Sequence, residues 1–342
     1  MFSPSSQPTD AALPPASDSL RDRFGRSIDY VRISVTDRCD LRCSYCIPKG
    51  FRDFEEPAHW LTFDEIVRVA AAFARLGTRR FRLTGGEPLL RRNLPELIAR
   101  LAQLPQVEDL SLTTNGTQLA RHAQALRDAG LHRLNVSLDS LRGDCVQAIT
   151  GSDSLPRVLA GLEAAQQAGF RRIKINMVPM VGVNDSDVDD MVAFCIERGF
   201  VLRLIEAMPM GHTGQQTQGM PFEQVMERLQ ARHGLVPDTA PLGGGPARYW
   251  SSPATGFTLG LITPMSQHFC ASCNRVRLAV DGTLYMCLGQ NDDFALRERL
   301  RSGCSETELE EALRQAIELK PERHEFNEKP EQTVRFMSMT GG

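Results

Sequence analysis

The fold is decided by the stretch VRISVTDRCDLRCSYC, residues 31–46, which joins a β-like run to a loop that carries three cysteines. Residues 31–36 predict the first strand of a repeating pattern. Five similar runs follow, at residues 80–84, 109–114, 133–138, 172–178 and 201–206. Amphipathic stretches separate these runs, so the chain predicts a strand–helix unit repeated six times.

The helix boundaries support this reading. Thr62 directly precedes the run 63–76, and Glu65 lies three residues after Thr62, which is a capping-box pattern. Four helical runs stop at a glycine, the residue that best adopts the left-handed conformation past a helix end; these are Gly77, Gly130, Gly169 and Gly199.

Six strand–helix units imply a parallel sheet with right-handed crossovers. Two more units would be needed to close an eight-stranded barrel, and the rhythm breaks after residue 206. We therefore expect an α/β fold, an open and incomplete (βα)6 barrel, with the doubly wound sheet as the alternative.

The remaining segments suggest three regions: a disordered tail over 1–21, the barrel over 22–220 and a C-terminal region over 221–342. The tail is rich in Ser, Pro, Ala and Asp and has no apolar core of a secretory signal. After the last predicted strand, 211–219 and 242–247 predict flexible loops, 256–288 predicts short strands with a hairpin at Asp281-Gly282, and 294–318 predicts a helix.

Composition narrows the function classes. The formal net charge of −3 argues against a nucleic-acid binder, and no apolar run approaches the ~20 residues of a membrane helix. The chain has nine cysteines, an odd number, and six of them form two tight groups. This pattern favours metal sites in a cytoplasmic enzyme over a disulfide framework.

Polar and glycine-rich segments follow the predicted strands at their C-terminal ends, where parallel barrels carry their active sites. These segments include Gly85-Gly86-Glu87-Pro88, Thr113-Thr114-Asn115-Gly116, Ser137-Leu138-Asp139, Lys174 with Asn176, and Glu206 with Met208.

The first cysteine group is Cys39, Cys43 and Cys46. A [4Fe–4S] cluster usually takes four cysteine ligands, so three local thiols leave one iron open to a small molecule. The C-x3-C-x2-C spacing, the aromatic Tyr45 and the GGEP element together resemble the radical S-adenosylmethionine (SAM) superfamily. The alternative is a zinc site with a distant fourth ligand.

The second cysteine group is Cys270, Cys273 and Cys287. With the nearby His268 it could form a Cys3His zinc site, and iron–sulfur is the competing reading. Arg275 and Arg277 lie two apart on a predicted strand, so they face the same way. Two guanidiniums beside a three-ligand cluster favour a phosphorylated substrate, although a solvated strand face would show the same spacing.

Nearly the whole chain, from about residue 22 to the end, resembles the GTP 3′,8-cyclase family. The motifs that carry the resemblance are VRISVTDRCDLRCSYC, FRLTGGEPLLRR, LTTNG, NVSLDS, the second cysteine group enclosing NRVR, and the terminal Gly341-Gly342. One departure is Ile47, where the family commonly has Met. The resemblance implies a SAM-dependent lyase that cyclises GTP to (8S)-3′,8-cyclo-7,8-dihydroguanosine 5′-triphosphate, the first step of molybdenum cofactor biosynthesis.

By resemblance, each cysteine group holds a [4Fe–4S] cluster. SAM contacts fall on Tyr45, Gly86, Ser137 and Met208. GTP contacts fall on Arg32, Arg82, Thr113, Lys174, Arg275, Val276 and Arg277. Catalytic roles fall on Arg275, Arg277, Gly341 and Gly342, because a tail without side chains can thread into a tight site.

The resemblance also implies an electron donor, a downstream cyclic pyranopterin monophosphate synthase and a homodimer. Two other readings remain at this point. A peptide-modifying radical SAM maturase would usually carry more C-terminal cysteines and lack NRVR, and a non-enzymatic zinc module would bind zinc and no chromophore.

Overall fold

The computed structural model describes residues 19–48, 50–52, 54, 57–239, 242–333 and 335–341. Most of the expected tail, residues 1–18, lies outside this range. Leu20 is 2% exposed and its backbone amide donates to the carbonyl of Leu76, so the packed chain already includes residues before the expected boundary at 22.

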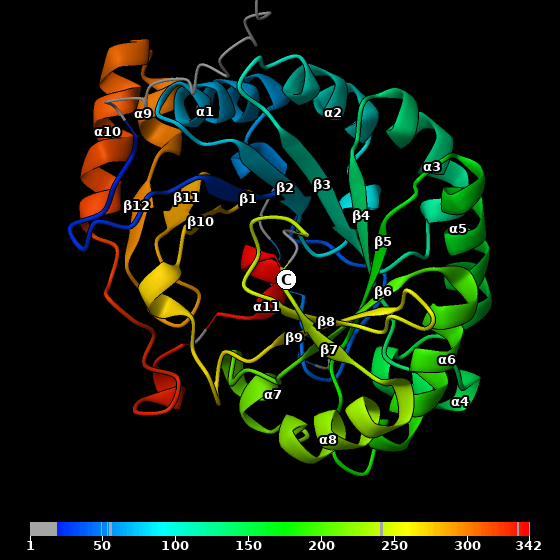
Figure 1. Ribbon diagram of the computed structural model, residues 1–342. Coiled ribbons are helices and arrows are strands. Elements are labelled where there is room, and N and C mark those ends of the chain that lie inside the picture. Colours follow the sequence, from blue (N-terminus) through cyan, green and yellow to red (C-terminus); the bar gives the residue numbers. More distant parts are fainter. Residues whose placement is uncertain are drawn as a thin grey trace, which may run out of the picture.

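Six parallel strands form an arc around a central space, in chain order (Figure 1). They are β1 (Tyr30–Ser34), β2 (Arg80–Thr84), β3 (Asp109–Thr114), β4 (Arg133–Ser137), β5 (Ile173–Met177) and β6 (Val201–Ile205). The arc confirms the predicted (βα)6 partial barrel, and all six strands lie within two residues of their predicted bounds.

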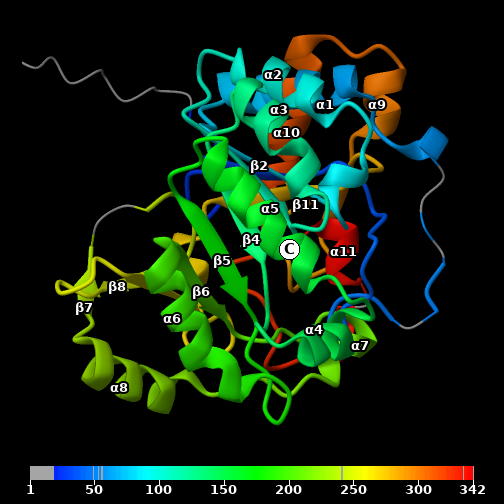
Figure 2. The same ribbon diagram turned by 90° about the vertical axis from the view of Figure 1, so that its right-hand side faces the viewer.

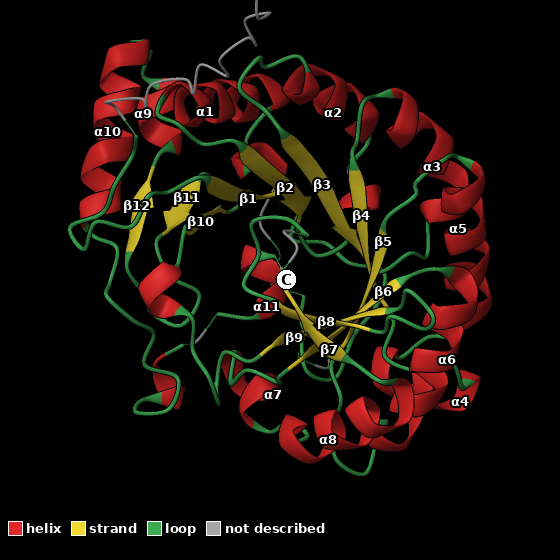
Figure 3. Ribbon diagram, in the orientation of Figure 1, coloured by secondary structure: helices red, strands yellow, loops and turns green. Residues whose placement is uncertain are grey.

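Helices cover the outside of the arc (Figure 3). They are α1 (Phe63–Arg75), α2 (Leu94–Ala102), α3 (Leu119–Asp128), α4 (Gly143–Thr150), α5 (Leu155–Gln167) and α6 (Val188–Arg198). The capping box of Thr62 and Glu65 is present in full. Gly77, Gly130, Gly169 and Gly199 all have positive φ, as predicted for residues that follow a helix.

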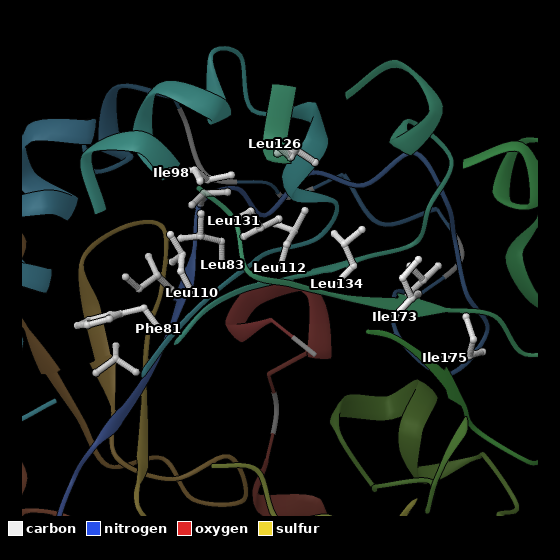
Figure 4. Close-up of a cluster of buried hydrophobic side chains, with 14 of the residues drawn as sticks. Phe81, Leu83, Ile98, Leu110, Leu112, Leu126, Leu131, Leu134, Ile173 and Ile175 are labelled. Atoms are coloured by element: carbon white, nitrogen blue, oxygen red, sulfur yellow. The ribbon is translucent and has the colours of Figure 1, made fainter. Parts of the chain in front are cut away.

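The hydrophobic core lies between the strands and this outer layer of helices. In Figure 4 the side chains of Leu83, Leu112, Leu134 and others point from the strands toward α2 and α3. Because strand side chains alternate between the two faces, the residues between them point into the barrel. Those residues are largely polar, so the interior of the barrel is not part of the apolar core.

The C-terminal region extends the same sheet at both edges. At one edge β9 (Thr258–Ile262) pairs parallel to β6 and continues into the antiparallel strands β8 (Arg248–Ser251) and β7 (Val236–Asp238). At the other edge β10 (Arg275–Leu278) pairs parallel to β1 and continues into the antiparallel strands β11 (Thr283–Tyr285) and β12 (Asp293–Ala295). The described strands do not pair β9 with β10, so the barrel stays open.

Two local predictions were wrong. Residues 294–318 are not one helix, because the end of β12 is followed by α9 (Arg297–Arg301), Gly303 with positive φ, and α10 (Glu306–Glu318). Ser305 and Glu308 form a second capping box that restarts the helix. Residues 211–219 are not a continuous loop, since α7 (Gly211–Gln215) lies within them and α8 (Phe222–His233) follows.

The described chain ends within the arc of strands. The short helix α11 (Met337–Thr340) lies in the central space in Figure 1, and in the view of Figure 2 it appears just above α4 and α7. Gly341 follows it and is buried, whereas Gly342 lies outside the described residues. In the part of the chain that the structure describes, no helix is long and apolar enough to cross a membrane.

Candidate active site

The first cysteine loop is held against the glycines that follow β2. A Cβ on Gly85 would overlap the Thr36 carbonyl, and one on Gly86 would overlap the Arg38 carbonyl. The Gly86 and Glu87 amides donate to these same two carbonyls, each at 2.8 Å. The glycines therefore allow a backbone contact that fixes the start of the cysteine loop.

Glu87 connects this contact to the end of β3. Its fully buried carboxylate accepts hydrogen bonds from Thr114 Oγ1 at 2.7 Å, the Asn115 amide at 2.6 Å and the Leu89 amide at 3.0 Å. Burial raises its pKa to about 7, against the lowering effect of these donors. The GGEP carboxylate thus ties two rim loops together.

The three thiols of the first group are largely enclosed and receive hydrogen bonds from the protein. The Leu41 amide lies 3.4 Å from Cys39 Sγ, and the Ser338 backbone of α11 lies close to the Cys46 thiol. Burial raises the pKa of Cys39 and of Cys46 to about 12 and raises that of Cys43 well above its usual value. Thiolates would therefore form here only with a cation bound, as metal ligation requires.

Tyr45 leads from this loop into the interior. Its hydroxyl donates to Asp139 Oδ2 at 2.7 Å, and Asp139 Oδ1 accepts from the Val178 amide at 2.8 Å. Burial raises the pKa of Asp139 to about 6. Tyr45, Asp139, Ser137 and Met208 all line one cavity of about 210 Å³ inside the barrel.

The second cysteine group faces the same cavity from the other side of the open barrel, since Cys270, Cys273 and Cys287 are all among its lining residues. The His268 ring lies 5.8 Å from that of His324. Among the described residues, no group of three or more His, Cys, Asp or Glu side chains is arranged to hold a single metal ion.

Cations line the same cavity as the second cysteine group. Register places Arg277, Arg32 and Arg82 side by side on β10, β1 and β2, all pointing inward. Like charges directly opposite one another on neighbouring strands destabilise a sheet. Burial, Arg277 and Arg82 hold the pKa of Arg32 well below its usual range, and burial and Arg275 lower that of Arg277 to about 10.

Lys174 and Arg203 extend this charge along β5 and β6. Lys174 is 2% exposed and donates to the Leu242 carbonyl and to the Tyr249 hydroxyl, and burial together with Arg203 lowers its pKa to about 6. Arg203 is 3% exposed and donates to Asn135 Oδ1. Arg203 was not predicted from the sequence, although a charge flanked by Leu202 and Leu204 in a strand is a signal for an inward-facing polar position.

None of these cations has a carboxylate partner among the described residues. The set without an ion pair comprises Arg32, Arg82, Lys174, Arg203, Arg275 and Arg277. Several buried polar atoms in the same interior also lack a hydrogen-bond partner; they are Arg32 Nε, Thr113 Oγ1, Asn176 Oδ1, Arg203 Nε, Arg275 Nε and the Tyr30 hydroxyl. Buried polar groups are normally satisfied, so this concentration marks the place of an anionic, hydrogen-bonding ligand.

The expected site residues are brought together with four qualifications. Lys174 is not among the residues that line the cavity, and its ammonium group donates to the Leu242 carbonyl and the Tyr249 hydroxyl. The Val276 side chain points outward into the hydrophobic core, so only its backbone could meet a ligand. Gly86 packs against the cysteine loop instead of lining the cavity. Arg277 donates to the Gly341 carbonyl, and Gly342 lies outside the described residues.

Comparison with known proteins agrees with this geometry. The chain matches the Radical SAM superfamily over residues 33–195 and Molybdenum Cofactor Synthesis C over residues 200–326, so the two matches meet before the expected boundary at residue 220. It is 46% identical to a GTP 3′,8-cyclase of Ectopseudomonas mendocina (strain ymp), over 95% of this chain and 99% of the relative. It is 44% identical to a GTP 3′,8-cyclase of Marinobacter nauticus (strain ATCC 700491 / DSM 11845 / VT8), over 94% and 98%.

Among solved structures, the chain is similar to Streptococcus suis SuiB bound to S-adenosylmethionine. The TM-score is 0.58 at 14% identity, over 91% of this chain and 75% of that one. At this identity the similarity concerns the fold alone.

Proposed function

Because this chain belongs to the GTP 3′,8-cyclase family of radical SAM enzymes, we propose that it converts GTP to (8S)-3′,8-cyclo-7,8-dihydroguanosine 5′-triphosphate, the first step of molybdenum cofactor biosynthesis. The observation that carries the proposal is the row of inward cations without carboxylate partners, in a cavity that is lined by the second cysteine group and by Tyr45 of the first cysteine loop. A triphosphate supplies the negative charge that this interior lacks.

A radical SAM enzyme holds a [4Fe–4S] cluster and SAM, and we assign this cluster to Cys39, Cys43 and Cys46. When bound, this pair supplies a 5′-deoxyadenosyl radical, which takes a hydrogen atom from C3′ of GTP. The rim residues orient SAM. Tyr45, Ser137 and Met208 face the cavity, and Gly86 allows the close contact between its own backbone and the Arg38 carbonyl of the cysteine loop. Asp139 fixes the Tyr45 ring through its hydroxyl.

The phosphates of GTP meet Arg32, Arg82, Lys174, Arg275 and Arg277, and Thr113 adds a hydroxyl whose oxygen has no partner. Guanidiniums bind phosphate oxygens in bidentate fashion, and a buried site strengthens each contact. The β10 backbone at Val276 can add one peptide group. We add Arg203 to this set because it faces the same cavity.

A second [4Fe–4S] cluster on Cys270, Cys273 and Cys287 is part of the proposal. Three thiols facing the substrate cavity fit such a cluster, and its fourth iron would be free to take the guanine base. Arg275 and Arg277 lie between these thiols in sequence and face the same cavity. The cluster would therefore hold the base of the nucleotide while the two arginines hold its phosphates.

The C-terminal glycines act as a backbone arm in this site. Gly341 is enclosed, and its carbonyl accepts from Arg277, a proposed substrate ligand. The arm would hold Arg277 at a fixed position and help activate the substrate complex. We expect Gly342 to act in the same arm as Gly341.

Family membership alone supports the remaining parts of the proposal. They are a one-electron donor for the first cluster, transfer of the product to a cyclic pyranopterin monophosphate synthase, a homodimer, and a cytoplasmic location, where free thiols remain reduced.

The test is anaerobic reconstitution with iron and sulfide, metal analysis, and incubation with SAM, dithionite and GTP. About eight irons per chain, 5′-deoxyadenosine and a cyclised guanosine triphosphate are expected. Zinc in both cysteine groups, or no 5′-deoxyadenosine from fully loaded protein, would overturn the proposal.

A further inference from the structure

Lys320 is a buried cation with no part in the predicted site. It follows α10, only two residues past the helix end, and is 2% exposed. Lysine is almost never fully buried unless its ammonium group is paired. The position of this side chain therefore calls for an explanation from its contacts.

The ammonium group of Lys320 donates to two backbone carbonyls of the segment that carries the second cysteine group. Nζ donates to the Arg275 carbonyl at 2.9 Å and to the Met286 carbonyl at 2.7 Å. The Cys273 thiol lies near the same ammonium group, which lowers its pKa. Arg275 follows Cys273 by two residues and Met286 directly precedes Cys287, so one side chain joins both arms of the cysteine segment.

A second cation fixes the segment that carries Lys320. Arg26 is 9% exposed and donates to the carbonyls of Pro321, Glu322 and Cys270, at 2.6, 2.7 and 2.9 Å. The carboxylate of Asp22 pairs with Arg26. The N-terminal segment thus locks Lys320 against the cysteines, and its ammonium group cannot turn away to solvent.

The charge of Lys320 has no carboxylate partner among the described residues. An unpaired buried ammonium is costly, because two neutral carbonyls do not balance a full charge. The groups left to balance it are the cysteines on the two arms that it joins, Cys273 and Cys287.

The first cysteine group has the opposite surroundings. Asp40 follows Cys39 directly and shares the Asn115 amide with it, and Tyr45, between Cys43 and Cys46, donates to Asp139. Net charge and hydrogen bonds to sulfur set the reduction potential of an iron–sulfur cluster. Three thiolates on an oxidised [4Fe–4S] core leave one net negative charge and reduction adds another, so a fixed cation favours the reduced form.

We propose that Lys320 is a positioning residue for the second iron–sulfur cluster: it joins the two arms that carry Cys273 and Cys287, and its fixed positive charge raises the reduction potential of that cluster. This inference rests on the proposed second cluster. A residue at the C-terminal end of α10 would thus act on the reduction potential of the cluster in the substrate site.

The experiment is an EPR-monitored redox titration of the reconstituted full-length chain. The background is a triple Cys39→Ser, Cys43→Ser, Cys46→Ser variant, in which any remaining cluster signal comes from the second group. Lys320→Met removes the charge at similar length, and Lys320→Arg retains it. Lys329→Met is the matched control, because Lys329 is about half exposed and pairs only with Glu325.

We expect Lys320→Met to move the midpoint potential to a more negative value, with Lys320→Arg and Lys329→Met close to the parent. The inference would be overturned by a Lys320→Met variant that retains its four irons and has the same midpoint potential as the parent. If Lys320→Met loses the cluster, Lys320→Gln serves instead, since an amide still donates to the carbonyls. A parent potential in that variant would overturn the inference, and loss from both neutral variants with retention in Lys320→Arg would support it.

Failure of the proposed second cluster is a separate result. The triple-serine parent would then bind no iron before any change at Lys320. The iron content of the parent therefore decides the cluster, and the potentials of the variants decide the role of Lys320.

Discussion

Three arginines on neighbouring strands point into the barrel, and no described carboxylate neutralises them. Arg277, Arg32 and Arg82 are adjacent in register, so each raises the free energy of the folded state without ligand. An anion removes this repulsion only when it is bound. A residue that destabilises the empty protein and stabilises the complex is expected at a binding site.

Replacement of Arg32 tests this balance. Arg32→Met should raise the unfolding free energy of the nucleotide-free protein by about 0.5 kcal/mol and weaken GTP binding by about tenfold or more, the loss of one charge-assisted hydrogen bond. Denaturant unfolding and calorimetric titration measure the two effects. Arg68→Met, at an exposed pair with Glu306, should leave GTP binding unchanged. A less stable variant with wild-type affinity would contradict this account of Arg32.

Lys174 gives GTP binding a pH dependence. Its pKa is lowered to about 6 in the free protein by burial and Arg203, so it is mostly neutral at pH 7.5. A bound triphosphate favours the charged form, so binding takes up a proton and affinity should fall as pH rises from about 6 to 8. Titration in buffers with different ionisation heats should detect the proton. Lys174→Arg should remove this uptake, and uptake that persists in Lys174→Arg would place the proton elsewhere.

Most of these residues were predicted from the family motifs that contain them. The spacing of the charged residues alone would not have identified them. Arg203 was missed although its alternation with Leu202 and Leu204 was visible. Lys320 and Arg26 could not be found from local patterns, because 294 residues separate them and only the folded chain brings both to the second cysteine group.

At the scale of elements, the rim loops behave as one connected layer. Glu87, after β2, accepts two hydrogen bonds from the end of β3, and the preceding glycines contact the cysteine loop after β1. A shift of one loop would therefore move the next. The GGEP element acts as a structural link in addition to any contact with SAM.

Removing this link should weaken the whole rim. Glu87→Ala leaves two buried amide groups and the Thr114 hydroxyl without their acceptor, so the unfolding free energy should fall by about 2–3 kcal/mol. Chemical denaturation measures the change, with Glu96→Ala on the exposed side of α2 as the control. Equal stability of the two variants would show that Glu87 does not join the loops.

The elements of the barrel were predictable because their signals are local: apolar runs for strands, and glycines and a capping box for helix ends. The parallel pairing of β9 and β10 with the barrel edges was not predictable, since it joins segments far apart in sequence. The break in 294–318 had a local signal, Gly303 followed by the Ser305–Glu308 capping box, and the apolar periodicity on both sides concealed it.

At the scale of the molecule, the chain returns its C-terminus to the centre of the barrel (Figure 1). There the Ser338 backbone of α11 lies close enough to Cys46 to lower the pKa of its thiol, and the residue after α11 accepts from Arg277. One four-residue helix thus spans the distance from the first cysteine group to the proposed substrate ligands. This position is what the proposed role of the C-terminal glycines requires.

Gly341 tests this arrangement. Its φ is +75°, and a Cβ would overlap the Thr84 side chain, so Gly341→Ala should displace the tail. We expect cyclisation to fall by at least tenfold, with iron content and SAM binding unchanged. Gly182→Ala is the control, because Gly182 has φ of +71° and open space around it. Deletion of residues 341–342 should reproduce the loss, and full activity in both variants would remove the tail from the mechanism.

The central claim, radical cyclisation of GTP, is tested most directly with GTP that carries deuterium at C3′. The reconstituted enzyme would be incubated anaerobically with SAM and dithionite, and both products would be analysed by mass spectrometry. We predict that the deuterium appears in 5′-deoxyadenosine while the nucleotide gains the 3′,8 bond. Unlabelled 5′-deoxyadenosine together with uncyclised GTP would contradict the claim.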